Sequence, residues 1–268
     1  MSERGVVRTL LAGCLTVTAL SGCAAIRDAL ADPSVIDPSR PFQGSPSETY
    51  ADGADGIVIP AAAQVGKYPA ADVEAAYQTS KRMLVAAHLD RQTLLGGAPE
   101  AFTALLDQEQ RKHFLNYLDS KDQDKNTRSW VTSFAPGSVD LVGDVIKVKA
   151  AMSAEEGKDD QGGPELWVSY TFRAVYPVRP KGVPGPVLRV MAFVKARHEY
   201  WRDKPEGPLR HWDGPSVDMW SAWTECDSPD GFLRPDYEGM PNVVPTSDAY
   251  DDNAPATKKG ECEAVGEI

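Results

Sequence analysis

The chain has 268 residues, with 28 Lys and Arg against 39 Asp and Glu, and its formal net charge is −11. An acidic chain repels the phosphate backbone, so this composition argues against a nucleic-acid-binding protein. The length predicts one large domain, or one domain with long flanking segments.

Residues 1–22 have the pattern of a secretory signal peptide. Arg4 and Arg8 precede an uncharged, mostly apolar stretch over residues 9–26 that ends in small residues. The alternative is an uncleaved membrane helix, but the stretch of about 18 residues is at the short limit for spanning a bilayer. The pattern therefore predicts an exported protein.

The end of this stretch, Leu20-Ser21-Gly22-Cys23, resembles the lipobox of bacterial lipoproteins. The resemblance implies cleavage before Cys23 and lipidation of its sulfur, with acyl chains such as palmitate. Two acyl chains anchor a protein stably, whereas one holds it only marginally. We therefore expect a protein attached through Cys23 to the extracytoplasmic face of the cell membrane. The Pro, Ala and Asp content also resembles that of exported actinobacterial proteins.

The remaining cysteines predict a disulfide bond. Cys14 leaves with the signal and Cys23 is assigned to the lipid, so Cys226 and Cys262 form an even pair in an exported protein. Closing a loop of this size would stabilise the fold by about 3–4 kcal/mol. A metal site is a poor alternative, because the two cysteines belong to no CxxC motif and have no neighbouring His.

Residues 23–67 are predicted to be a flexible, Pro-rich tether between the membrane and the folded domain. Proline, serine, glycine and aspartate dominate this segment, and such a composition buries too little apolar surface to order itself. Its one apolar patch, Ile57-Val58-Ile59, is a candidate edge strand. The domain itself is predicted to occupy residues 68–226.

Two or three helices are predicted at the start of the domain. Apolar residues at helical spacing indicate a helix over 70–95, after Pro69 and before the Gly96-Gly97 pair. A second apolar segment follows Pro99. Asp107 and Gln110 have the spacing of a capping box for a helix over 108–118.

After residue 126 the apolar period changes from helical to alternating. Strands are predicted over 139–152, 165–178 and 187–201, with a fourth within 209–226. The polar, glycine-rich stretch 153–164 and the stretch 177–186 are predicted turns. Residues 227–268 have little periodicity and are predicted to be an irregular tail that the disulfide ties back.

This order of elements predicts an α+β fold, with the helices packed on a curved antiparallel sheet of about four strands. Helices first and a bent sheet second resembles the NTF2-like cone, which implies a pocket between the helices and the sheet. A cystatin-like arrangement of helix on sheet fits the same order.

A candidate pocket follows from strand alternation. His198 and Tyr200 lie on the apolar face of one predicted strand, Tyr170 lies on the apolar face of another, and His88 can face the sheet from the first helix. An imidazole there could contact a ligand or act as a base. The alternative is a buried histidine that serves the core. His113 and His211 are predicted to be exposed.

Aromatic residues suggest a different kind of site. Tyr200, Trp201, Trp212, Trp220 and Trp223 lie close together in sequence, and indole faces can stack on the sugars of a cell-wall glycan. The alternative is cross-strand packing in the sheet.

No metal site, cofactor site or set of catalytic residues is predicted. Asp122, Asp124 and Asn126 begin like a calcium loop, but Thr127 stands where the turn needs Gly and Ser133 where a bidentate Glu is needed. The sequence therefore predicts a non-catalytic envelope lipoprotein that binds a protein partner or a small apolar ligand. The alternative is a glycan-binding protein or a cell-wall-associated enzyme.

Overall fold

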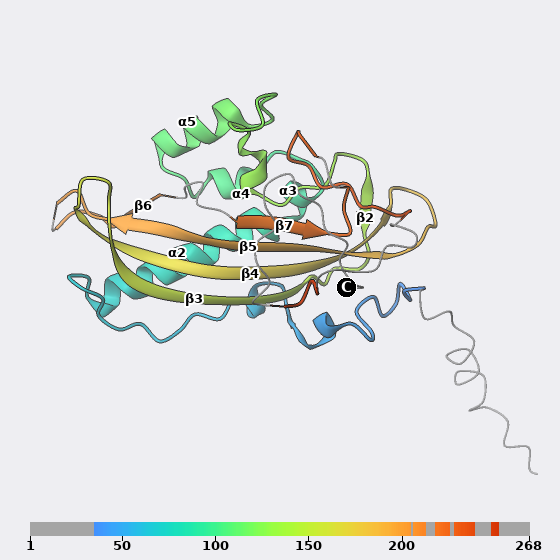
Figure 1. Ribbon diagram of the computed structural model, residues 1–268, viewed down its shortest axis with the longest axis horizontal. Helices are drawn as coiled ribbons and strands as arrows, with labels where there is room; N and C mark the ends of the chain where they lie inside the picture. Colours follow the sequence, from blue (N-terminus) through green and yellow to red (C-terminus); the bar gives the residue numbers. More distant parts are fainter. Residues whose placement is uncertain (1–34, 205, 213–217, 226–227, 239–247, 252–268) are drawn as a thin grey trace, which may run out of the picture. The chain divides into compact units, whose positions relative to one another are not determined.

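The computed structural model describes residues 35–204, 206–212, 218–225, 228–238 and 248–251. They form helices and an antiparallel sheet, with the long helix α2 lying along one face of the sheet (Figure 1). The predicted α+β class is therefore confirmed, although the numbers of helices and strands differ from the prediction. None of the helices in this part of the chain combines the length and apolar character needed to span a bilayer.

Helix α2, Ala70–His88, starts after Pro69 and ends earlier than predicted. Asp90 begins a separate short helix, α3 (Arg91–Leu94), because its side chain accepts a hydrogen bond from the Thr93 amide. The Tyr176 hydroxyl donates to the His88 carbonyl over 3.0 Å, which satisfies one of the carbonyls left unpaired at the end of α2.

Helices α4 (Glu100–Thr103) and α5 (Gln108–Tyr117) complete the helical part. The Asp107 side chain accepts from the Gln110 amide at 2.9 Å, which confirms the predicted N-cap of α5. The reciprocal half of the capping box is absent, because the Gln110 side chain donates to the His211 carbonyl instead.

Within the described residues, the sheet has three long strands and four short ones. The strands are β1 (Ala51–Asp52), β2 (Val139–Leu141), β3 (Lys147–Lys158), β4 (Pro164–Pro180), β5 (Leu188–Trp201), β6 (Arg210–Trp212) and β7 (Asp218–Ala222). Their order is β1-β3-β4-β5-β6, while β2 also pairs with β4 and β7 with β5. The strand predicted within 209–226 corresponds to β6 and β7, whereas β2 was predicted as part of a longer strand and β1 was not predicted.

The first predicted strand was wrong in its extent. Residues 139–152 divide into β2 and the start of β3, and β3 continues through the predicted turn to Lys158. Every residue of β3 pairs with β4, so ladder hydrogen bonds outweigh the polar composition of its second half. The turn is confined to 159–163, where the Asp159 side chain accepts from the amides of Gln161 and Gly163.

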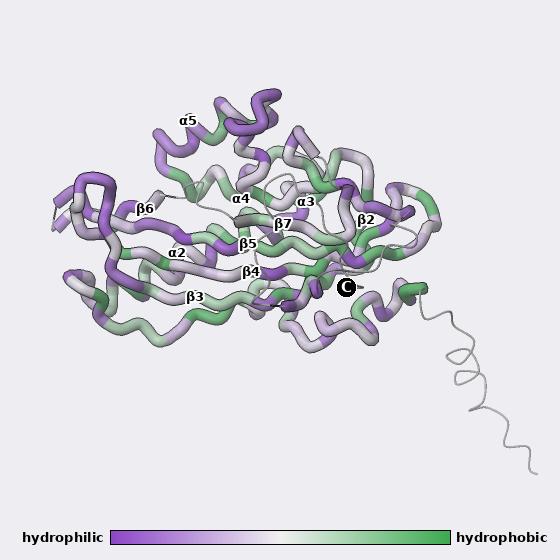
Figure 2. Tube along the Cα trace, in the orientation of Figure 1, coloured by the Kyte–Doolittle hydropathy of each residue, from purple (hydrophilic) through white to green (hydrophobic). Residues whose placement is uncertain are grey.

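Strand alternation divides the sheet into an inner face, toward α2, and an outer face. On the inner face, Phe172, Ala174 and Tyr176 of β4 are fully buried and lie beside Val194, Ala192 and Val190 of β5. Figure 2 shows hydrophobic and hydrophilic segments following one another along β4 and β5. The outer face carries the intervening residues, including Trp167, Arg173 and Arg197.

The predicted tether is wrong from Ile36 onward. Phe42 packs with Val175 and Met191 on the outer face, and Arg189 Nε donates to the Pro41 carbonyl at 2.7 Å. Ile57 is 1% exposed and bridges Ala150 on β3, so part of the predicted apolar patch does dock at the sheet edge. A few well-spaced apolar side chains order this polar segment, whereas residues 23–34 lie outside the described part.

The described parts of the predicted tail, 228–238 and 248–251, are irregular and packed on the domain. Leu233 bridges Phe134, and Ala249 joins the outer-face cluster around Met191. The Tyr250 hydroxyl lies 2.9 Å from Ser45 Oγ. These contacts hold the two segments, while both cysteines of the predicted disulfide lie outside the described residues.

Candidate functional site

The four residues of the predicted pocket all lie in the interface between α2 and the inner face. His198 and Tyr200 are each 1% exposed, His88 is 4% exposed and Tyr170 is 6% exposed. His88 comes from the last turn of α2 and the other three from β4 and β5. Strand and helix periodicity therefore placed them correctly on buried faces.

A line of polar contacts crosses this interface at Ser80. Ser80 Oγ lies 2.9 Å from His198 Nδ1 and 2.7 Å from the Tyr200 hydroxyl. That hydroxyl also donates to the Ala76 carbonyl over 2.9 Å. The Tyr170 ring lies 4.8 Å from the His198 ring. These contacts satisfy polar groups that burial would otherwise leave unpaired, and they fasten α2 to the sheet.

His88 has similar surroundings at the C-terminal end of α2. Its Nδ1 lies 2.9 Å from Thr132 Oγ1, and its ring stacks on Phe172 with the ring centroids 4.9 Å apart. Burial raises the pKa of the neighbouring Tyr176 far above its ordinary value, so its hydroxyl remains a neutral donor to the His88 carbonyl.

A small cavity separates the two histidines. His88, Tyr170 and His198 line it together with Trp130 and Met219, whereas Tyr200 does not. Its space is about 20 Å³, which is enough for about one water molecule. A second cavity of about 70 Å³ lies on the other side of Met219, toward Leu233. The structure thus brings three of the four predicted residues together around a space much smaller than a ligand site.

The Ser80–His198 pair has the composition of a nucleophile and base, but its surroundings do not suit catalysis. Ser80 is 0% exposed, and its hydroxyl is shared between His198 and Tyr200. A nucleophile must reach its substrate. This pair is therefore a structural contact in the interior.

The tryptophans of the predicted glycan platform do not form one surface. Trp201, Trp212 and Trp220 are half-buried. Trp220 stacks on Phe193 at 5.1 Å, and the Arg210 guanidinium lies 5.4 Å from the Trp201 ring centroid. Trp201 and Trp220 are therefore occupied by neighbours on the outer face.

Trp167, which the sequence did not single out, is another half-buried indole on the outer face. The Arg197 guanidinium lies 3.7 Å from its ring centroid, and a Cβ on Gly157 would lie only 2.0 Å from the ring. Trp167 Nε1 donates to Glu165 at 2.8 Å. Burial raises the pKa of Glu165. Gly157 is needed here because any side chain would displace the indole.

A different aromatic group gathers where α5 meets β6. The His113 ring centroid lies 5.0 Å from that of Tyr117, 5.9 Å from that of Trp130 and 6.4 Å from that of Trp212. His113 is exposed and the other three are half-buried. We call these four residues the aromatic cluster. The i, i+4 spacing of His113 and Tyr117 was visible in the sequence, but their neighbours come from other elements.

An ion pair joins the start of α5 to β6 beside this cluster. Arg210 Nη2 lies 3.1 Å from Asp107 Oδ2. Burial acts to raise the pKa of Asp107, but the hydrogen bonds from the Gln110 amide and from Arg210 outweigh it and lower that pKa. The N-cap of α5 therefore also fixes the edge of the sheet.

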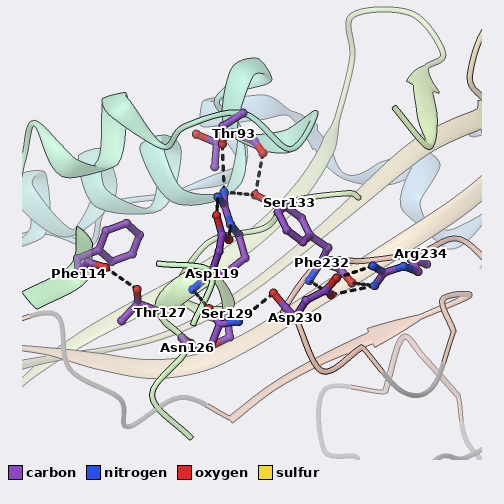
Figure 3. A network of polar contacts seen from close by, with 12 residues as sticks. Thr93, Phe114, Asp119, Asn126, Thr127, Ser129, Ser133, Asp230, Phe232 and Arg234 are labelled. Carbon is purple, nitrogen blue, oxygen red and sulfur yellow. Dashed lines mark hydrogen bonds and ion pairs between the residues drawn. The ribbon is translucent and has the colours of Figure 1, made fainter. Parts of the chain in front are cut away.

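Buried Arg128 holds the segment before Trp130. Two of its partners, Asp119 and Ser133, are labelled in the polar network of Figure 3. Its guanidinium bonds both carboxylate oxygens of Asp119, at 2.7 and 3.0 Å, and donates to the Gly97 carbonyl at 3.0 Å. Its guanidinium carbon lies 4.7 Å from the Phe232 ring centroid. One arginine thus connects the helical part to the C-terminal segment.

The segment that resembles a calcium loop has other structural roles. Lys125 Nζ pairs with Asp122 at 2.7 Å, and the Asn126 side chain accepts from the Arg128 amide and donates to the Asp230 carbonyl. No cluster of three or more His, Cys, Asp or Glu suited to a metal occurs among the described residues.

The remaining predicted site residues, Cys23, Cys226 and Cys262, lie outside the described part of the chain. Lipidation and the disulfide bond stay predictions. Comparison with known proteins found no matching family model, no similar curated protein and no similar solved structure.

Proposed function

We propose that the protein is an exported lipoprotein, anchored through Cys23 to the extracytoplasmic face of the cell membrane, and that its α+β domain is a non-catalytic binding module of the cell envelope. The observation behind the binding mode is the small space at His88 and His198. Because about one water fits there, we assign binding to the exterior of the domain and not to an internal apolar pocket. The NTF2-like resemblance rests on element order alone.

The anchor is tested by fractionating cells that express the full chain with a C-terminal epitope. We expect the wild type in the membrane fraction, labelled by an alkyne analogue of palmitate, and Cys23→Ser without label. Cys14→Ser is the matched control, because it changes a cysteine of the signal that the lipobox does not use. Equal labelling of wild type and Cys23→Ser would contradict the anchor.

The binding mode is tested by native mass spectrometry of the mature chain carrying Cys23→Ser. We expect the mass of the bare polypeptide, with an oxidised Cys226–Cys262 pair. A retained apolar molecule that disappears on denaturation would restore the internal pocket as the site.

A further inference from the structure

The aromatic cluster brings together four rings from three separate elements. His113 and Tyr117 lie one turn apart on α5, Trp130 closes the short helix Thr127–Trp130, and Trp212 ends β6. A core would bury such rings, yet His113 is exposed and the others are only half-buried. The cluster therefore presents aromatic surface at the exterior.

The elements that carry the cluster are fixed to one another. Arg210 pairs with Asp107 at the start of α5, and the Gln110 side chain donates to the His211 carbonyl, next to Trp212. The Arg128 network holds the segment that ends in Trp130. A surface built this way loses little conformational entropy on binding.

Polar groups suited to hydroxyl recognition lie on the same helix. Glu109 lies four residues before His113 and Asn116 three residues after it, so both share its side of the helix. Both side chains are exposed. An aromatic surface beside exposed planar polar groups matches the two-sided chemistry of a sugar ring.

The outer-face indoles provide an internal contrast. Trp167 lies against Arg197 and Gly157, and Trp220 stacks on Phe193. Those rings are engaged by charged, backbone or aromatic neighbours within the sheet. In the aromatic cluster the central ring, His113, remains exposed.

We infer that the aromatic cluster is a saccharide-binding site, at which the apolar face of a sugar ring packs on the aromatic rings while its hydroxyls bond exposed side chains of α5 such as Glu109 and Asn116. This inference rests on the proposed function, because an exported, anchored module would meet the glycan of the cell wall. It names the ligand class of that module.

The test uses the mature chain carrying Cys23→Ser, with ¹⁵N-labelled tryptophan, and the β-1,4-linked tetramer of N-acetylglucosamine as the probe. Each of the six tryptophans gives one indole resonance. We expect the resonances of Trp130 and Trp212 to shift on titration, with half-saturation at about 1 mM or below. His113→Ala should weaken binding at least tenfold, and Trp201→Ala, the matched control, should leave it unchanged.

His113 is exposed, so His113→Ala should fold even if a change at Trp212 does not. Three outcomes would overturn the inference: no shift at about 10 mM probe, shifts confined to Trp201 and Trp220, or equal binding by His113→Ala and Trp201→Ala. Each is distinguishable from failure of the proposed function, because membrane fractionation of Cys23→Ser reports on the anchor independently of any saccharide.

Discussion

Two groups of histidine and aromatic side chains have similar compositions and opposite surroundings. In the interior, His88 and His198 contact the hydroxyls of Thr132 and Ser80 and are closed in by the sheet. At the exterior, His113 is surrounded by rings and stays exposed. The comparison teaches that residue type and face do not define a site. The space left beside a side chain, and the partners it already has, decide what it can bind.

The comparison also separates stability from binding. Interior side chains should carry folding energy, and exterior ones should carry little of it. The following changes test that division, from the largest expected effect to the smallest.

Phe172→Ala should have the largest effect on the interior. Phe172 is 0% exposed and supports the His88 ring. Its truncation should lower the free energy of unfolding by about 3–5 kcal/mol, through lost burial and a residual cavity. Urea denaturation measures this. The matched control is the neighbouring outer-face change Thr171→Ala, expected within about 0.5 kcal/mol of wild type; similar losses for both would erase the distinction between the faces.

Arg128→Met should have the next largest effect, because Arg128 links the interior to the segment that carries Trp130. The change removes the bonds to Asp119 and to the Gly97 carbonyl. Asp119 is half exposed and can rehydrate, so we expect a loss of about 2–3 kcal/mol, below that for a fully buried pair. Thermal unfolding provides the measurement, with exposed Lys121→Met as the control. A variant as stable as wild type would mean that packing alone holds this segment.

Ser80→Ala should cost about 1–3 kcal/mol, because it leaves buried polar groups of His198 and Tyr200 with one partner fewer. Tyr200→Phe tests the same network from its other side. The double variant should lose less than the sum of the two single losses, with a coupling of about 0.5 kcal/mol or more. Strictly additive losses would show that the two residues act independently.

Asp107→Asn should have the smallest effect, and one that depends on pH. Asparagine keeps the N-cap of α5 but removes the charge that pairs with Arg210. The folded pKa of Asp107 is lowered, so the ionised carboxylate stabilises the fold above its unfolded pKa, and this stabilisation disappears as the pH falls through the folded pKa.

The difference in Tm between wild type and Asp107→Asn should therefore be small and positive at pH 7 and smaller at pH 2. A partly exposed pair contributes at most about 1 kcal/mol. Glu109→Gln, an exposed change two residues further along, serves as the control. A difference that does not change between these pH values would assign the effect to packing of the cap and not to charge.

The long elements could be predicted from the sequence because their periodicity was unbroken. Alternation from Leu166 to Val178 gave β4 within two residues of its observed ends, and it also placed Tyr170 on the buried face. The same reasoning failed for residues 153–158, where the pairing partner and not the local composition determines the strand. It also failed for residues 36–67. Single apolar side chains such as Phe42 and Ile57 pack on the sheet there, but isolated residues form no repeating hydrophobic pattern that the sequence could show.

The two candidate sites also differ in how far the sequence could predict them. Periodicity placed His198 and Tyr200 on a buried face, but whether a cavity remains there depends on how neighbouring side chains fill it, which alternation does not report. The aromatic cluster joins α5, a short helix and β6, which are far apart in sequence. Without homologous sequences, nothing in the chain links Trp130 to Trp212 before the fold brings them together.

The packing of the N-terminal segment has a mechanical consequence. A protein pulled through a lipid at Cys23 would receive the force first at residues 36–50. These residues are held by Arg189 and by the Ser45–Tyr250 contact, and the two-residue strand β1 follows directly after them. The ladders of β3, β4 and β5 are far longer. We expect this segment to peel away under tension before the sheet yields. About 15 residues would then extend, adding roughly 50 Å of reach while the folded domain stays intact.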